Sequence, residues 1–255
     1  VPNTDELASA THHFIQNRSV FDDYNVGSFE RDALSKLDEL FQKNPVQIMV
    51  GGSGLYVDAV LKGLDYFPDV DPKIREELTK QLQEKGIETL QEKLKELDLE
   101  TYHSIAIDNP HRIMRALEIC IGAEIPYSTF KNKPKTPRNF TSIKIGLNAE
   151  REVIYSRINK RVDHMLANGL LEEAEKLYPN KDLNALQTVG YRELFSFFDG
   201  EFTQEFAISE IKKNTRRFAK RQGTWFKKDE ETLWFDYQTN INEIITKISD
   251  KINDI

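Results

Sequence analysis

The chain has 255 residues, of which 39% are hydrophobic and 30% charged, which allows one sizeable core or a core with a smaller inserted domain. No apolar run approaches the roughly 20 residues of a membrane-spanning helix and no segment resembles a signal peptide, so we expect a cytoplasmic protein with no membrane partner. The formal net charge of −7 argues against wholesale attraction to nucleic acid and leaves a local basic surface for that role.

The first part of the chain predicts one α/β unit. It begins at Val1 in a loop-like segment with no strand before it, and we expect that an N-terminal segment is missing. Residues 26–44 carry apolar side chains at helical spacing. The β-branched run VQIMV (46–50) predicts a strand, GGSG (51–54) a tight turn, and the segment after it a helix. A strand followed by a helix in this way predicts a parallel sheet.

The middle of the chain predicts a helical excursion from that sheet. Residues 71–97 have the pattern of two helices separated by Gly86, and a third helix (110–121) follows the capping residues Asp108 and Asn109. The proline-broken stretch 131–140 predicts a linker, and TSIKIGL (141–147) a returning strand. We therefore expect a core formed by residues 1–66 and 141–255, with a helical insertion domain at 67–140.

The last third predicts long helices at 150–167, 170–178, 191–198 and 204–226, then a strand at 232–237 and a terminal helix. Cys120 lies in the third helix of the insertion, where a buried apolar side chain is expected rather than a reactive thiol. A lone cysteine forms no disulfide within the chain.

The glycine-rich segment 51–54 is the first candidate for chemistry. Glycines after a parallel strand let backbone amides approach a phosphate or a substrate. Ser53 is the one side chain in this segment that can hydrogen-bond a substrate. The lysine of a phosphate-binding loop is absent, so an ordinary tight turn fits the pattern equally well.

A basic run at 212–228 is the second candidate. It contains eight Lys or Arg residues and no acidic residue, which leaves the rest of the chain at about −15 (−7 − 8). Helical spacing places Ile211, Phe218 and Trp225 on a packing face. The cations on another face are Lys213, Arg217, Lys220 and Lys227. Such a face binds phosphates without reading sequence, although a solvated helix face is the alternative.

Two arginines of the 150–167 helix, Arg157 and Arg161, are the third candidate. Their spacing of four lets both guanidinium groups project from one side and bind an anion such as a diphosphate. Salt bridges to Glu152, Asp163 or Glu172 are the alternative. The five histidines show no metal-binding pattern, so we expect no metal site in this chain.

Five segments occur in an order typical of a known family: VGGSGLYVDAVLKGL, DNPHRIMRALEI, RINKRVDHMLANGLLEEAEKL, TVGYREL and TRRFAKRQGTWFKK. Together with the opening HHFIQNRSVFDDYNVGSFERDA, they resemble the tRNA dimethylallyltransferases, also called tRNA isopentenyltransferases. The resemblance covers nearly all of the chain.

The resemblance implies a P-loop kinase-like α/β fold, here with its N-terminal part missing, and a helical insertion domain. It also implies transfer of a dimethylallyl group from dimethylallyl diphosphate to N6 of adenine 37 in the tRNA anticodon stem-loop, usually with Mg²⁺. The adenine is extruded into a channel, as base-modifying enzymes require. We expect a monomer.

Carried over by motif, Ser53 stands where the family usually has threonine and faces the substrate base, which makes it the candidate catalytic residue. Arg157 and Arg161 are implied to hold the diphosphate. The residues implied to contact tRNA, besides Ser53, are Arg75, His111, Arg112, Ile113, Met114, Arg115, Thr188, Val189, Gly190, Tyr191, Arg192, Glu193, Lys220, Arg221, Gln222, Gly223, Thr224, Trp225, Phe226 and Lys227.

Two family motifs have no counterpart in the sequence: the phosphate loop ending in Gly-Lys-Ser/Thr, and a segment whose aspartate is the general base. We expect both upstream of Val1, and we expect the 255 residues alone to be inactive. Two other functions remain open: prenylation of free adenine nucleotides, as in the adenylate isopentenyltransferases, and tRNA binding without catalysis.

Overall fold

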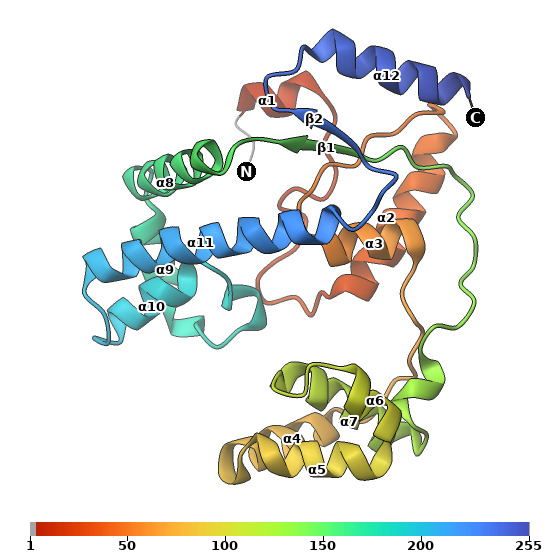
Figure 1. The fold of residues 1–255 in the computed structure, drawn as a ribbon. Helices are drawn as coiled ribbons and strands as arrows, with labels where there is room; N and C mark the ends of the chain where they lie inside the picture. Colours follow the sequence, from red (N-terminus) through yellow and green to blue (C-terminus); the bar gives the residue numbers. More distant parts are fainter. Residues whose placement is uncertain (1–3, 255) are drawn as a thin grey trace. The chain divides into compact units, whose positions relative to one another are not determined.

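A computed structural model describes residues 4–254 of the chain. The chain forms two compact units, of which unit 1 consists of Val1–Leu61 and Asn139–Ile255, and unit 2 of Lys62–Arg138 (Figure 1). The boundaries expected from the sequence, after residues 66 and 140, lie a few residues further along the chain.

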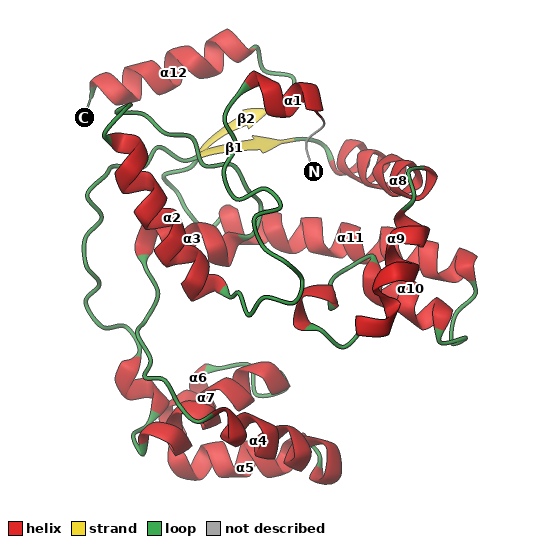
Figure 2. Cartoon of the chain, turned by 180° about the vertical axis from the view of Figure 1, so that it is seen from behind, coloured by secondary structure: helices red, strands yellow, loops and turns green. Residues whose placement is uncertain are grey.

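The described part of unit 1 is mostly helical, with two short strands (Figure 2). Its elements are α1 (Thr4–Ser9), α2 (Val26–Phe41), α3 (Gly54–Lys62), β1 (Ile145–Asn148), α8 (Arg151–Ala167), α9 (Leu170–Leu177), α10 (Tyr191–Phe198), α11 (Gln204–Phe226), β2 (Leu233–Asp236) and α12 (Ile241–Asn253), with short 3₁₀ turns η2 (Tyr178–Asn180) and η3 (Asn184–Leu186). The expected helices from residue 150 onward are confirmed.

The sheet of unit 1 is a parallel pair. β1 and β2 run in register from Ile145 beside Leu233 to Asn148 beside Asp236. The expected strand after the linker and the expected strand near the end of the chain are therefore confirmed. The described residues form no further strand of the expected P-loop kinase-like core, so the fold is α/β at this coarser level.

The strand expected at residues 46–50 is not formed. A strand needs a neighbour whose backbone groups pair with its own, and within residues 4–254 the two strands pair with each other. Ile48 and Val50 are consequently 86% and 89% exposed. The β-branched composition of the run predicted a strand, but composition supplies no pairing partner.

The core of unit 1 lies between α8, α9, α10 and α11. Its most buried side chains include Leu186, Leu194 and Ile211. Thr203 begins α11 by accepting a hydrogen bond from the backbone N–H of Phe206, which satisfies one of the free amides of the first turn. In Figure 1, α11 runs past α9 and α10 toward α3.

Unit 2 is a helical bundle of α4 (Pro72–Lys85), α5 (Ile87–Leu97), α6 (Leu99–Ser104) and α7 (Pro110–Ala123), followed by the 3₁₀ turn η1 (Tyr127–Phe130). Gly86 separates α4 from α5 with φ +81°, a conformation that glycine adopts without strain. Asn109 begins α7, its side chain accepting from the N–H groups of His111 and Arg112. The three helices expected here are confirmed, whereas α6 was not anticipated.

Buried Leu90, Leu94, Ile113 and Leu117 form the centre of unit 2. Cys120 is packed into the same cluster, as expected, and burial raises the pKa of its thiol. Among residues 4–254, no helix is long and apolar enough to cross a membrane.

Candidate functional site

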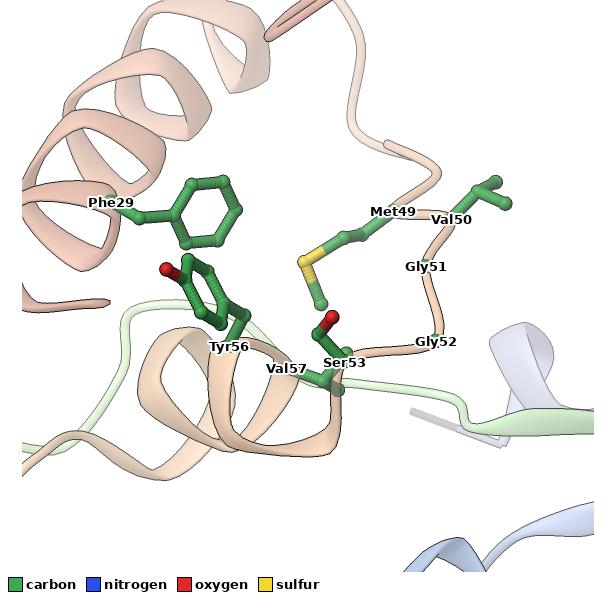
Figure 3. A pocket seen from close by; sticks show the side chains of 8 residues that line it. All are labelled: Phe29, Met49, Val50, Gly51, Gly52, Ser53, Tyr56 and Val57. Atoms are coloured by element: carbon green, nitrogen blue, oxygen red, sulfur yellow. The ribbon is translucent and has the colours of Figure 1, made fainter. Parts of the chain in front are cut away.

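Ser53 precedes α3 and lines a small pocket in unit 1. Its carbonyl oxygen accepts hydrogen bonds from the N–H groups of Tyr56 and Val57 and so starts α3. Its hydroxyl has no hydrogen-bond partner within the part of the chain that the structure describes. Figure 3 shows this hydroxyl and the Met49 side chain turned into the same space, facing Tyr56 and Phe29, while Val50 points away. Ser53 is therefore free to bond a ligand.

The pocket has a volume of about 220 Å³ and is lined chiefly by apolar and aromatic groups: Phe29, Met49, Val50, Gly51, Gly52, Ser53, Tyr56 and Val57. Phe29 packs between Phe14 and Tyr56, with ring centroids 5.4 and 5.2 Å away. An apolar recess that carries the hydroxyls of Ser53 and Tyr56 suits a flat or branched apolar group that presents a polar atom. The sequence indicated Phe29 only as a packing residue of a helix, and its place in the pocket was missed.

The end of α11 packs directly on the glycine-rich segment. A Cβ atom added to Gly54 would lie 2.4 Å from the Trp225 ring, and one added to Gly52 would lie 2.1 Å from the Gln222 side-chain amide. Trp225 Nε1 also donates a hydrogen bond of 3.0 Å to Asp58 on α3. Gly52 and Gly54 thus allow the end of α11 to pack closely on the glycine-rich segment. This contact places Ser53 beside the basic helix.

The basic run divides into a neutralised part and a free part. Lys212 pairs with Asp163 at 2.5 Å, and Lys213 with Glu210 at 2.8 Å. The later cations form no ion pair with the residues that the structure describes, and they are Arg216, Arg217, Lys220, Arg221, Lys227 and Lys228. Positive charge without ion pairs to described residues is therefore concentrated in the C-terminal half of α11 and the two lysines that follow it.

The packing face expected on α11 is only partly formed. Ile211 is buried, but Phe218 and Trp225 are 46% and 41% exposed. The N-terminal half of α11 packs against α8 and α10, whereas the C-terminal half extends beyond them, so a seven-residue repeat of apolar residues does not imply burial there. Exposed aromatics between free cations are a combination that binds single-stranded nucleic acid, by stacking and by phosphate contact.

Arg157 and Arg161 lie on α8, beside α11. Arg216 of α11 bonds Asn159 Oδ1 at 2.8 Å and thereby links the two helices. Neither Arg157 nor Arg161 forms an ion pair with a described residue, and Asp163, one expected partner, is taken by Lys212. The guanidinium of Arg157 instead stacks 4.4 Å from the ring centroid of Tyr237, just after β2. Both arginines are exposed and available to an anion.

The segment Thr188–Glu193 forms the turn into α10. Glu193 is buried, accepting from the Gly190 N–H at 2.8 Å and from Asn214 Nδ2 at 2.8 Å. Gly190 has φ +108°. The Glu193 carboxylate therefore shapes the turn and ties it to α11, and Arg192, Thr188 and the half-exposed Tyr191 offer the outer contacts. Contact of this segment with RNA stays a prediction.

Unit 2 carries the remaining candidates. His111, Arg112 and Arg115 are exposed on α7, whereas Ile113 and Met114, although in the same motif, are buried in the core. Helical geometry accounts for the difference, since side chains three and four apart share a face. Arg75 on α4 is also exposed, and it reaches Glu118 of α7.

A metal site was not expected, and residues 4–254 contain no group of three or more His, Cys, Asp or Glu side chains that could hold an ion. The described residues therefore form no closed set of protein ligands, whereas Mg²⁺ usually keeps several waters and binds one or two carboxylates together with substrate phosphates.

Three comparisons with known proteins bear on this site. A family model described as IPP transferase matches residues 1–229. A tRNA dimethylallyltransferase of Flavobacterium psychrophilum is 62% identical over 99% of this chain and 84% of its own length. A similar relative from Flavobacterium johnsoniae is 60% identical over 99% of this chain and 84% of its own length.

Among solved structures, a full-length tRNA isopentenylpyrophosphate transferase from Bacillus halodurans is 33% identical, with a TM-score of 0.67, and the match covers 99% of this chain and 80% of that one. A eukaryotic dimethylallyltransferase acting on tRNA gives a TM-score of 0.77 at 21% identity, covering 99% of this chain and 68% of that one. At that identity the likeness concerns the fold.

Proposed function

The chain belongs to the IPP transferase family, and on that basis we propose that it takes part in transferring a dimethylallyl group from dimethylallyl diphosphate to N6 of adenine 37 of tRNA. The observation that carries the proposal is the contact between two surfaces of unit 1. The half of α11 that holds free cations and exposed aromatics packs on the loop that holds Ser53. A nucleic-acid surface therefore adjoins a small pocket.

Each group of residues has a proposed role that follows from its chemistry. Free cations of α11 hold phosphates of the anticodon stem-loop, and exposed Phe218 or Trp225 offers a face on which an unstacked base can lie. The Ser53 hydroxyl bonds the extruded adenine at the pocket mouth. Its neighbours Phe29, Tyr56 and Val57 exclude water from the space in which an apolar group is transferred.

Arg157 and Arg161 hold the diphosphate. In the reaction the N6 nitrogen forms a bond to the allylic carbon while the bond from that carbon to the diphosphate oxygen breaks. Guanidinium groups stabilise the negative charge that develops on the leaving oxygen. The proton lost from N6 passes to the general-base aspartate that the family resemblance implies, which has no counterpart in the printed sequence.

Magnesium belongs to the proposal only as a companion of the diphosphate. Water and the diphosphate oxygens can supply most of the ligands of such an ion. We also propose that the protein acts as a monomer, and in the cytoplasm, where its tRNA substrate is found.

The test compares two proteins with unmodified tRNA and labelled dimethylallyl diphosphate. The 255 residues are expected to bind tRNA without transferring label, because they contain no Gly-Lys-Ser/Thr phosphate loop. A fusion that adds the segments of the Flavobacterium psychrophilum relative that lie outside the match, each at the corresponding end of the chain, is expected to transfer label to tRNA. In the fusion, Ser53→Thr should retain activity and Ser53→Ala should lose about 10²-fold or more.

The outcomes separate the competing functions. Transfer by the 255 residues alone would show that the phosphate loop and the general base are wrongly expected to lie outside them. A fusion that binds tRNA and transfers nothing would leave a tRNA-binding module, and a fusion that labels free AMP as readily as tRNA would indicate a nucleotide prenyltransferase.

A further inference from the structure

Glu118 is a buried carboxylate on α7 that contacts two exposed arginines of unit 2. Its side chain is only 4% exposed, whereas those of Arg75 and Arg115 are 51% and 47% exposed. Arg75 Nη1 donates to Oε1 of Glu118 at 2.7 Å, and Arg115 Nη1 lies 3.4 Å from Oε2. One interior carboxylate therefore fixes one guanidinium from α4 and another from α7.

The arrangement leaves most of each guanidinium free. An arginine has five N–H donors in a rigid fork, and each of these arginines uses one nitrogen on Glu118. Arg115 is held from a second side by Phe67, whose ring centroid lies 5.5 Å from its Cζ. Arg75 lines a shallow hollow of about 490 Å³ along α4, together with Glu76, Thr79 and Lys80. The outer edges of both arginines therefore face solvent.

We propose that Glu118 is a positioning residue for tRNA binding, which orients Arg75 and Arg115 so that their outer N–H groups meet RNA phosphates. This rests on the proposed function and on the expectation, carried over by motif, that both arginines contact tRNA. Two charges preset by one carboxylate lose less side-chain entropy on binding than two free arginines. The alternative is that Glu118 only stabilises the fold of unit 2, as buried ion pairs can.

Glu118→Gln separates these roles by the sign of its effect. It removes one negative charge, so a long-range charge effect alone would tighten RNA binding. Loss of positioning would instead weaken it. We expect the full chain with Glu118→Gln to bind an anticodon stem-loop RNA about tenfold more weakly. The slope of log affinity against log salt concentration should fall by about one unit, which corresponds to the loss of one phosphate contact. Glu96→Gln, at an exposed carboxylate of α5, is the control for charge and should not weaken binding.

Binding is measured at temperatures where circular dichroism shows each variant folded. If Glu118→Gln does not fold, Glu118→Asp is used, since it keeps the charge but withdraws the oxygens from both arginines; we expect weaker binding at unchanged net charge. Unchanged or tighter binding by the folded variant overturns the positioning role. Arg75→Ala tests the premise that Arg75 contacts tRNA. If the Arg75→Ala variant binds RNA normally, that contact is wrong. If this variant binds weakly while the Glu118→Gln variant binds normally, only the positioning role of Glu118 is wrong.

Discussion

Gly54 has no Cβ atom, and the Trp225 ring packs in the space that a Cβ atom would need. It lies at the start of α3, where alanine would normally favour the helix by up to about 1 kcal/mol. Here an added Cβ would lie 2.4 to 2.6 Å from three atoms of the Trp225 ring. At Gly52 the obstructing atom is the end of a flexible glutamine side chain, which can move.

We therefore predict that Gly54→Ala destabilises the protein by about 1–3 kcal/mol, the usual range for overpacking, and displaces Trp225 from its hydrogen bond to Asp58. Denaturant unfolding and the fluorescence of Trp225 measure the two effects. Gly52→Ala is the matched control and should cost clearly less. Equal stability of the two variants would mean that Trp225 does not pack on Gly54 in solution.

Tyr191 supplies a prediction about pH. Burial, and then the hydrogen bond of 2.6 Å that its hydroxyl donates to Glu173, raise the pKa of Tyr191 to about 12. Because an unfolded tyrosine has a pKa of about 10, the folded state holds this proton more tightly. The stability that results is complete below pH ~10 and is lost as the pH rises from about 10 to 12.

Tyr191→Phe should accordingly reduce the alkaline fall in the free energy of unfolding, measured by denaturant titration across that pH range. Tyr66→Phe removes an exposed hydroxyl and should leave the fall unchanged. An identical alkaline profile for the wild type and Tyr191→Phe would contradict the assignment.

At the scale of elements, the two halves of α11 differ in the charge that they offer to RNA. Lys212 and Lys213 are paired with carboxylates, whereas Arg217 and Lys220 are exposed and free of ion pairs to described residues. Each cation that neutralises a phosphate adds about one unit to the slope of log affinity against log salt concentration.

Arg217→Ala with Lys220→Ala should therefore weaken tRNA binding and lower that slope by about 2. Lys212→Ala with Lys213→Ala removes the same charge from the same helix and should lower it by less than about 1. Filter binding over a range of salt concentrations gives both slopes. Equal slopes for the two double variants would mean that α11 binds RNA only through its overall charge.

Elements that depend on local pattern could be predicted from the sequence, and those that depend on partners could not. The spacing in 204–226 and the cap at Asn109 are local, and α11 and α7 form where expected. The run 46–50 needed a neighbouring strand, and Phe218 needed a helix to cover it. For the same reason the motifs indicated Ser53 and the basic residues, while Phe29 of the pocket and Glu118 beneath the arginines emerged only from the three-dimensional contacts.

At the scale of the whole molecule, a chain with net negative charge carries a positive surface in each unit. The net charge is −7, yet cations without ion pairs to described residues gather on α11 in unit 1, and exposed arginines lie on α4 and α7 in unit 2. An acidic chain discourages non-specific binding of nucleic acid. Each positive surface can be tested by itself if its unit is stable without the other.

Unit 2 has the interior of an independent domain. Its core cluster is drawn entirely from residues between Ile74 and Tyr127. Buried Asp98 accepts hydrogen bonds from the Thr101 N–H and hydroxyl and from the Ser128 N–H. Burial acts to raise the pKa of Asp98, but these hydrogen bonds outweigh it and hold the pKa below its ordinary value.

We predict that residues 62–138, expressed alone, unfold cooperatively, with a helical circular dichroism spectrum and a two-state denaturant transition. Asp98→Ala should lower the stability of this fragment by at least about 2 kcal/mol, since it leaves buried donors unpaired, and should shift the corresponding transition of the full chain by a similar amount. A fragment without a cooperative transition would show that the arginine cluster around Glu118 depends on unit 1 for its geometry, and RNA-binding measurements on unit 2 would then have to be made in the full chain.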